Sequence, residues 1–289
     1  MENILQDKSQ GWKNILKLII PYIFIVGTCQ MIGYYFAGLD ITNYQNIHKT
    51  PKESFIVTFS TLVGTFVTIW LFRKFVDKKT FASLGFEKIL IAKDIFIGLI
   101  LGFIIMLSGF TCLILSKQLE FLTIKFNLTD LLLSIGIFIF VAISEEVLLR
   151  GYILNNLMTS FNKYFALIIS SVIFSLLHVA NPNFNLFSLF ELFISGLFLG
   201  LAYIYTKSLW FPIALHFSWN FFQGTIFGFN VSGIEQYSLI VTKYKTANIW
   251  NGGGFGFEGS ILSVFFQLFS IVIIILIFKK RLTKNNLLG

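Results

Sequence analysis

The sequence predicts an all-α membrane protein, a polytopic helix bundle with about eight transmembrane helices. Of its 289 residues, 56% are hydrophobic and only 12% are charged, whereas a soluble domain carries about 25% charged residues. This composition excludes an ordinary soluble enzyme and intrinsic disorder. The chain has two cysteines, Cys29 and Cys112, and both lie in long apolar runs, which excludes a disulfide scaffold.

Eight stretches are long and apolar enough to cross a bilayer, which requires about 20 residues each. In chain order, we predict spans at 15–36, 55–72, 94–116, 131–150, 164–180, 184–206, 209–229 and 259–278. We expect the fourth span to continue as a helix to Met158, because apolar residues recur among the polar ones there. The first apolar run is too long for a signal peptide. We interpret the whole chain, 1–289, as one membrane domain.

The positive charge indicates the orientation in the cell membrane. Most of the 22 lysines and arginines lie in the termini and in the connections that share a side with them, so the positive-inside rule predicts that both termini are cytoplasmic. The net charge of +8 includes a basic cluster, Arg73, Lys74, Lys78 and Lys79. We interpret this cluster as an anchor beside anionic lipid of the bilayer, and we expect no nucleic-acid partner.

The longest connection, residues 230–258, contains the glycine-rich stretch NGGGFGFEG. We expect it to be a flexible connector on the extracytoplasmic side. The alternative is a lid or a segment that docks a partner.

Ionisable side chains inside the spans are the strongest indication of function, because each costs about 2.5 to 3.5 kcal/mol to insert. The candidates are Glu145, Glu146 and Arg150 in the fourth span, His178 in the fifth, Glu191 in the sixth and His216 in the seventh. We assign no role to Glu191.

Glu146 and Arg150 stand at i and i+4, so they can form an ion pair on one helical face. Glu145 lies about 100° away on the helix and is left without an ion-pair partner. Burial of an unpaired carboxylate favours its protonated form, which suits a general base. The alternative for Glu146 and Arg150 is a purely structural clamp at the end of a helix.

Two spacings bring further polar groups toward Glu145. Glu145 and His178 are each about 16 residues from the turn expected at 161–163, so an antiparallel hairpin places them at the same height. In HFSWN, His216 and Asn220 are four residues apart and point the same way, while Trp219 and Phe217 point elsewhere and pack. Three helices therefore offer one base, two imidazoles and an amide.

These residues carry a resemblance to the CPBP family, which comprises CAAX prenyl endoproteases and bacteriocin-processing (Abi) membrane proteins. The segment EEVLLR, with Glu145 and Arg150, resembles the EExxxR motif of that family. FSLLH, with Phe174 and His178, resembles its FxxxH motif, and HFSWN resembles its HxxxN motif. The motifs occur in the family's order and define a CPBP-like catalytic core at 131–229.

The resemblance implies an intramembrane endopeptidase that cleaves membrane-associated or lipid-modified peptides or proteins. By this resemblance, Glu145 activates the attacking water, His178 helps to hold it, and His216 and Asn220 stabilise the oxyanion. Glu146, Arg150 and Phe174 would have supporting roles.

The resemblance leaves two mechanisms open. Either the reaction uses no metal, or Glu145, His178 and His216 hold zinc, since two imidazoles and a carboxylate leave an open fourth position. Asn220 favours the mechanism without metal, because an amide suits an oxyanion hole and is not a usual zinc ligand. We expect the cavity in the cytoplasmic half of the bilayer, opening inward.

Two other classes of function compete with a peptidase. One is a non-catalytic membrane adaptor or a bacteriocin self-immunity protein that retains the fold. The other is a transporter that uses the carboxylates as a proton relay, which the lack of an internal repeat disfavours. The composition, rich in Phe, Ile, Lys and Asn, is typical of a low-GC bacterium, where a peptide precursor, a pheromone or a bacteriocin leader is the expected substrate.

Overall fold

The computed structural model describes residues 10–40, 49–86 and 91–286, with side chains as far as residue 276. The structure is 74% helical, and over the described residues eight continuous helices form an all-α bundle, as predicted. Within the described part, five helices are long and apolar enough to cross a membrane, and the shorter helices at 163–176 and 261–276 are also apolar.

Each predicted span overlaps one helix of the structure, and α4 and α5 are two segments of one continuous helix. The helices are α1 Gln10–Ala37, α2 Pro51–Leu71, α3 Ile91–Leu115, α4 Leu128–Glu146, α5 Asn155–Ser160, α6 Lys163–Leu176, α7 Leu186–Thr206, α8 Trp210–Asn220 and α9 Ile261–Asn286. Wider π-helical turns extend three of them, at η2 Phe72–Val76, η4 Val147–Leu154 and η5 Phe221–Ile226. Because η4 joins α4 to α5, the fourth span runs unbroken from Leu128 to Ser160, which confirms its predicted continuation.

Polar residues set where several helices begin. Thr50 caps α2 and forms a capping box with Glu53, with Pro51 in the first turn. Asn127 caps α4 by accepting from the backbone N–H of Asp130, and Asn185 caps α7. The bundle's chain reversals therefore lie at residues that satisfy the free N–H groups of the next helix.

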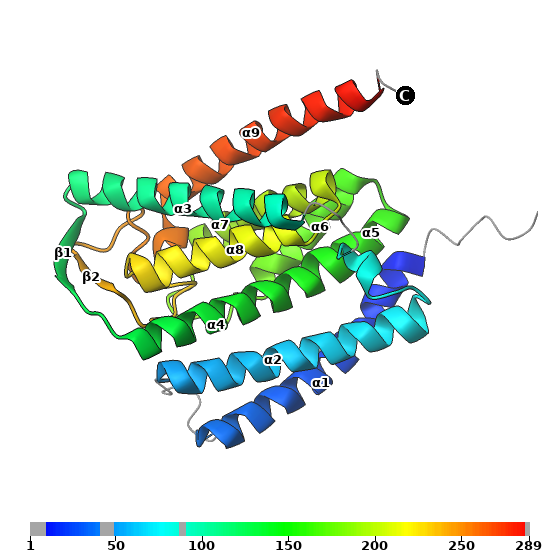
Figure 1. Cartoon of the computed structure of the whole chain (residues 1–289), viewed down its shortest axis with the longest axis horizontal. Coiled ribbons are helices and arrows are strands. Elements are labelled where there is room, and N and C mark those ends of the chain that lie inside the picture. The colour runs from blue at the N-terminus through cyan, green and yellow to red at the C-terminus, as the bar shows by residue number, and fades with distance from the viewer. Residues whose placement is uncertain (1–9, 41–48, 87–90, 287–289) are drawn as a thin grey trace, which may run out of the picture.

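The helices form layers around α4 and α8 (Figure 1). Helices α1 and α2 lie side by side on one flank, and α2 packs on α4. Helix α8 lies between α3 and α4, while α6 pairs with α7 and α7 also contacts α9. The central core includes Leu149, Leu154 and Ala166, all fully buried. This packing brings the motif-bearing segments α4, α6 and α8 around one interior space.

Two short strands close one end of the bundle, β1 Leu119–Ile124 and β2 Ile240–Tyr244. They pair antiparallel from Leu119 opposite Tyr244 to Ile124 opposite Ile240, and they lie at the far end of the molecule from α5 (Figure 1). The segment 230–258 is therefore built into the fold: it supplies β2, and Asn251, Phe255 and Phe257 are buried. The expectation of a simple connector is wrong.

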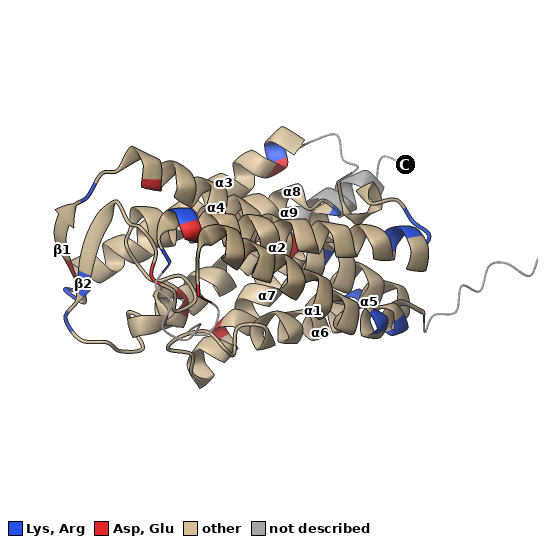
Figure 2. Ribbon diagram, turned by 90° about the horizontal axis from the view of Figure 1, so that it is seen from below, with Lys and Arg blue, Asp and Glu red and all other residues tan. Residues whose placement is uncertain are grey.

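The opposite end carries the basic cluster of the sequence, and Figure 2 shows lysines and arginines around α5 there. Lys74, Lys78 and Lys79 are exposed, but Arg73 is buried and forms an ion pair with Asp77 at 2.9 Å. Asp77 also accepts from Asn14 of α1 at 2.7 Å. Arg73 is thus a structural residue that holds Asp77, which in turn bonds to α1, and our interpretation of Arg73 as a lipid anchor is wrong.

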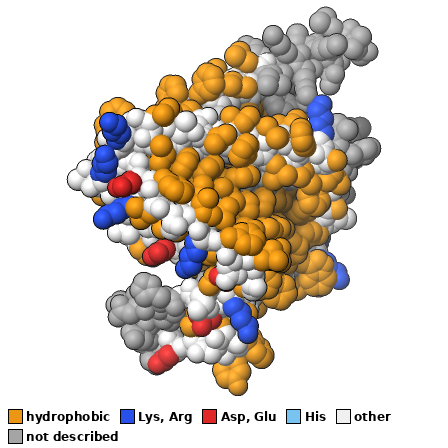
Figure 3. All heavy atoms as spheres, turned by 60° about the vertical axis from the view of Figure 1, so that its left-hand side comes forward, with side chains coloured by type: hydrophobic (Ala, Val, Ile, Leu, Met, Phe, Trp, Pro, Cys, Tyr) orange, Lys and Arg blue, Asp and Glu red, His pale blue; other side chains and the backbone are white. Residues whose placement is uncertain are grey.

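Large apolar side chains cover the flanks of the bundle (Figure 3). On α1 alone, Ile20, Phe24 and Tyr35 are 73 to 78% exposed. A soluble protein would bury such a surface, whereas lipid solvates it at no cost. Together with the five long apolar helices, this belt identifies a multi-pass membrane protein.

Candidate active site

Three of the four candidate catalytic residues lie where regular helices end, and His216 lies within α8. Glu145 and Glu146 are the last two residues of α4, and Asn220 is the last residue of α8; a π-helical turn follows each. His178 lies in a turn just beyond Leu176, the end of α6. π-Helical turns rotate the side chains that follow them and are frequent at functional sites. The 3.6-residue repeat of an α-helix therefore does not give the directions of the side chains that follow these turns.

His216 lies between two consecutive carboxylates. Its Nδ1 is 2.8 Å from Glu146 Oε1, and its Nε2 is 3.9 Å from Glu145 Oε2. A carboxylate only accepts hydrogen bonds, so Nδ1 carries a proton and donates a hydrogen bond to Glu146. The second separation exceeds a hydrogen bond. Glu146 therefore fixes the ring, and Nε2 faces Glu145 without a direct bond.

Glu146 has two partners. As predicted, it pairs with Arg150, whose Nη1 is 2.7 Å from Oε1. Both side chains are almost completely buried, and Arg150 Nη2 also donates to the carbonyl oxygen of Gly196 on α7 at 3.3 Å. Glu146 is thus more than a structural clamp, because the oxygen that holds Arg150 also orients His216.

Phe174 joins this pair to the two histidines. Its ring lies under the Arg150 guanidinium, 4.6 Å from ring centroid to Cζ, a favourable cation–π geometry. Its centroid is 4.9 Å from that of His178 and 6.4 Å from that of His216. The phenylalanine of the FxxxH motif is therefore the apolar contact between the ion pair and both imidazoles.

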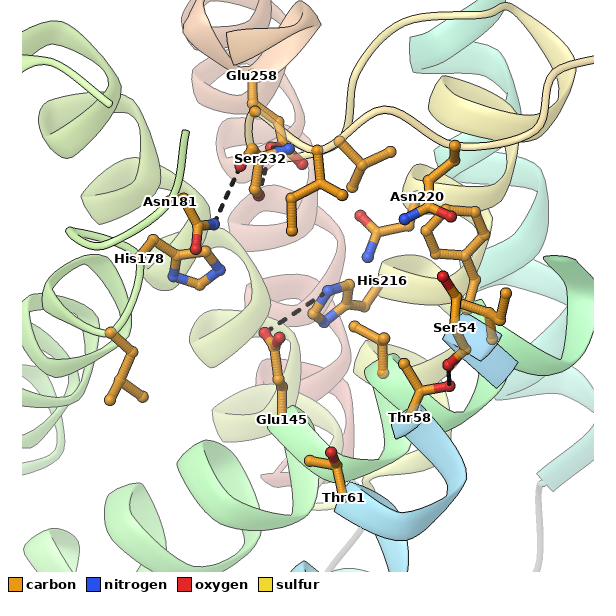
Figure 4. A pocket seen from close by; sticks show the side chains of 18 of the residues that line it. Ser54, Thr58, Thr61, Glu145, His178, Asn181, His216, Asn220, Ser232 and Glu258 are labelled. Atoms are coloured by element: carbon orange, nitrogen blue, oxygen red, sulfur yellow. Dashed lines mark hydrogen bonds and ion pairs between the residues drawn. The ribbon is translucent and has the colours of Figure 1, made fainter. Parts of the chain in front are cut away.

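The ring of His178 is bonded to the helix that precedes its turn. Its Nδ1 lies 2.8 Å from the carbonyl oxygen of Phe174, so Nδ1 carries a proton and the neutral ring keeps Nε2 as an acceptor. Figure 4 shows the rings of His178 and His216 on either side of the Glu145 carboxylate. The predicted hairpin therefore brings Glu145 and His178 to one site.

A cavity of about 1220 Å³ contains this group. The four residues named as catalytic, Glu145, His178, His216 and Asn220, all line it. The sequence analysis missed other contributions to its wall, for which no motif gave a signal. These come from α1 with Tyr22 and Gln30, from α2 with Ser54, Thr58 and Thr61, and from the segment 230–258 with Ser232 and Glu258.

The cavity reaches the end of the bundle that carries β1 and β2. Its wall includes the loop residues 181–183 and 230–237, whereas the described residues of the basic end, 73–86, 150–170 and 203–210, do not contribute to it. An opening toward the basic end was expected, and that expectation is wrong. The expectation took no account of the loops 181–183 and 230–237, which form part of the cavity wall at the other end of the bundle.

One smaller expectation is also corrected. Trp219 lines the cavity together with Asn220, whereas Phe217 stacks on Phe221 as packing. Glu191, to which the sequence analysis assigned no role, is fully buried and accepts from Ser195, Ser263 and Gln267. It joins α7 to α9.

A zinc site at Glu145, His178 and His216 can be tested against this geometry. Across the described ranges, no three or more His, Cys, Asp or Glu side chains form a group that could hold a metal ion. The bond from His216 Nδ1 to Glu146 does not count against zinc, because a metal-binding histidine commonly donates its other ring N–H to a carboxylate. The donor types of Glu145, His178 and His216 suit zinc, but their placement forms no such group, and we derive no step through a metal.

Comparison with known proteins gives one match. Residues 127–222, about a third of the chain, match the family model described as type II CAAX prenyl endopeptidase Rce1-like. No curated protein and no solved structure matches the chain. The matched segment contains all three motifs, and it confirms the similarity to the CPBP family. At the level of the family, this segment is similar to CAAX-protease-like membrane endopeptidases.

Proposed function

We propose that the protein is an intramembrane endopeptidase that hydrolyses peptide bonds of membrane-associated or lipid-modified peptides, with Glu145 as the general base. The observation that supports this most directly is the convergence of Glu145, His178, His216 and Asn220 on one cavity. Polar groups inside a bilayer are costly, and a purely structural bundle has no need for four of them around an open space.

In this mechanism, Glu145 and His178 hold the attacking water. One O–H bond of the water points to the Glu145 carboxylate and the other to Nε2 of His178, which is free because Nδ1 donates to Phe174. Glu145 takes the proton as the water oxygen attacks the carbonyl carbon of the scissile bond. The carbonyl π electrons move to the oxygen, which becomes the oxyanion.

His216 and Asn220 stabilise that oxyanion. The Asn220 amide donates in every protonation state. His216 donates through Nε2 when the ring is doubly protonated, a form that the carboxylates of Glu145 and Glu146 on its two sides stabilise. As the tetrahedral intermediate collapses, the C–N bond breaks and protonated Glu145 returns its proton to the leaving amine.

The orientation of the protein belongs to the same proposal. With both termini in the cytoplasm, as the positive-inside rule favours, the end with β1 and β2 faces outward, so the cavity opens to the extracytoplasmic side. The substrate would then be a peptide presented at the outer surface of the membrane, such as an exported precursor.

Reconstituted protein tests this function. A library of membrane-anchored peptides is incubated with the wild type and with Glu145→Gln and His216→Ala, and the products are read by mass spectrometry. We expect cleavage by the wild type and none by Glu145→Gln. A chelator is added in parallel, and cleavage should persist because no step uses a metal.

The same variants separate a peptidase from an adaptor, an immunity protein or a transporter. A non-catalytic adaptor or self-immunity protein keeps its phenotype in complementation with Glu145→Ala, whereas a peptidase loses it. A proton-coupled transporter shows pH-driven flux in liposomes without any cleaved product. Equal cleavage by the wild type and Glu145→Gln refutes the proposed role of Glu145.

A further inference from the structure

His178 lies outside regular helical structure. Helix α6 ends at Leu176, and His178 follows in a turn held by short-range bonds, from its N–H to Ser175 at 3.2 Å and from the Asn181 N–H to its carbonyl oxygen at 3.0 Å. A helix would fix the direction of a side chain by itself. In a turn, the position of His178 depends on its bond to Phe174 of α6 and on what packs against the turn.

The segment 230–258 is bonded to this turn. The Asn181 side chain donates to the carbonyl oxygen of Ser232 at 3.0 Å. Ser232 in turn donates twice to Glu258 Oε2, from its backbone N–H at 2.8 Å and from its hydroxyl at 2.7 Å. Figure 4 shows this chain of contacts above His178. It runs from the end of α6 to the residues that precede α9.

Close backbone contacts support the same attachment. Gly233 has φ +81°, and a Cβ there would lie 1.9 Å from the carbonyl oxygen of Pro182. Its N–H donates to Phe255 at 2.8 Å. Gly256, with φ +98°, has equally little room against Asn230. Only glycine fits such positions, so the two halves of the segment are pressed against each other and against the turn.

Glu258 is the buried end of this series of hydrogen bonds. It is 4% exposed, and among the residues that the structure describes, its carboxylate accepts only from Ser232. It lines the same cavity as His178 and His216, so it lies close to the catalytic group. Burying a carboxyl group with one neutral partner costs folding free energy. Packing alone does not explain a carboxyl group at this position.

We propose that Glu258 is a positioning residue, which holds the turn of His178 through Ser232 and Asn181. This inference rests on the proposed function, since it assigns His178 to the attacking water. Glu258 contributes as an acceptor of two hydrogen bonds, and its side chain takes no part in the chemistry.

Activity variants test this role. Glu258→Leu removes the acceptor, Glu258→Gln keeps a carbonyl oxygen in its place, and Glu120→Gln, which changes an exposed carboxylate on β1 outside the cavity wall, is the control. A displacement of about 1 Å can cost about 10²-fold in rate, so we expect Glu258→Leu to lower kcat at least about tenfold with KM nearly unchanged. Glu258→Gln should recover most of kcat.

A second measurement does not depend on activity. The chain has three histidines, and mass spectrometry resolves their modification by diethyl pyrocarbonate. We expect Glu258→Leu to accelerate the modification of His178 severalfold, with that of His216 unchanged because Glu146 holds it. Should the wild type cleave no peptide, the proposed function fails while this readout still tests the position of the turn.

Three results would overturn the inference. One is a Glu258→Leu protein that keeps both kcat and the reactivity of His178. Another is a Glu258→Gln protein as impaired as Glu258→Leu, which would assign the effect to charge. The third is equal acceleration at His178 and His216, the result of an opened lid. If Glu258→Leu does not fold, Ser232→Ala removes one of the two bonds and should show the same pattern more weakly.

Discussion

The Nδ1 atom of His216 donates a hydrogen bond to Glu146 over 2.8 Å, and the two residues lie 70 positions apart in the chain. The same carboxylate oxygen accepts from Arg150 at 2.7 Å. An arginine thus holds the carboxylate that orients the imidazole. Such an arrangement fixes which ring nitrogen faces the reaction, in the way that a buried carboxylate orients a catalytic histidine.

Replacing Glu146 by Gln should impair catalysis through His216. The amide has one oxygen for two donors, so either Arg150 or His216 loses its partner. Loss of an outer partner of a functional histidine costs about 10- to 100-fold, and we expect kcat to fall by that factor while KM changes little. Steady-state cleavage of the reconstituted substrate measures it. Unchanged kcat would show that His216 does not depend on Glu146.

Replacing Arg150 by Leu should destabilise the bundle. Breaking a buried ion pair by removing one partner costs about 3 to 5 kcal/mol, and Arg150 also holds the Gly196 carbonyl of α7. Unfolding in mixed detergent, followed by circular dichroism, measures the loss. Arg150→Lys should rescue only in part, because an ammonium lacks the planar fork that reaches both acceptors. Full rescue by Lys would contradict this account.

Replacing Asn220 by Ala should remove one oxyanion donor. Loss of such a donor costs about 10²- to 10³-fold in kcat, and KM should stay the same because the interaction forms in the transition state. The matched control is Ser218→Ala on the same helix, whose hydroxyl bonds to Leu99 of α3 at 2.7 Å. If both variants lose activity equally, a general defect of α8 explains the result and Asn220 has no special role.

The side on which the cavity opens can be read by labelling. In a Cys29→Ser, Cys112→Ser background, Glu235→Cys places a thiol on the cavity wall, and Lys163→Cys places one at the basic end. With cytoplasmic termini, a membrane-impermeant maleimide added to intact cells should label position 235 and not 163. The reverse pattern would invert the proposed orientation.

Glu258 should make stability depend on pH. Burial raises the pKa of Glu258 above its ordinary value, although the Ser232 bonds and the nearby His178 and His216 lower it in part; Glu191 of α7 also faces it. The folded state then holds the proton more tightly than the unfolded state does. Stability is therefore greatest below the ordinary pKa near about 4.3 and falls as pH rises toward the raised value.

The matched variant for this prediction is Glu258→Gln, which cannot ionise. The Tm of both proteins is measured in detergent from acid to neutral pH. As pH rises through that window, the Tm of Glu258→Gln should increase relative to the Tm of the wild type. A constant difference between the two proteins at every pH would show that ionisation of Glu258 is not linked to folding.

Much of this protein could be predicted from local sequence. Eight apolar stretches of membrane-spanning length anticipated the helices, because lipid requires every backbone polar group to be satisfied within a helix. The i, i+4 spacing of Glu146 and Arg150 predicted their ion pair, and the hairpin between α4 and α6 predicted that Glu145 and His178 meet. Each of these depends on distances along one helix or across one turn.

What the sequence alone determined, then, is the membrane class, the helices and the four polar residues that share a cavity. Only the tertiary structure decided that Glu146 orients His216, that α1 and α2 wall the cavity, and that Glu258 reaches the turn of His178. These contacts join segments 70 or more residues apart or pass through a glycine-rich loop without periodicity. No local pattern encodes them, because helix packing and close backbone approach set them.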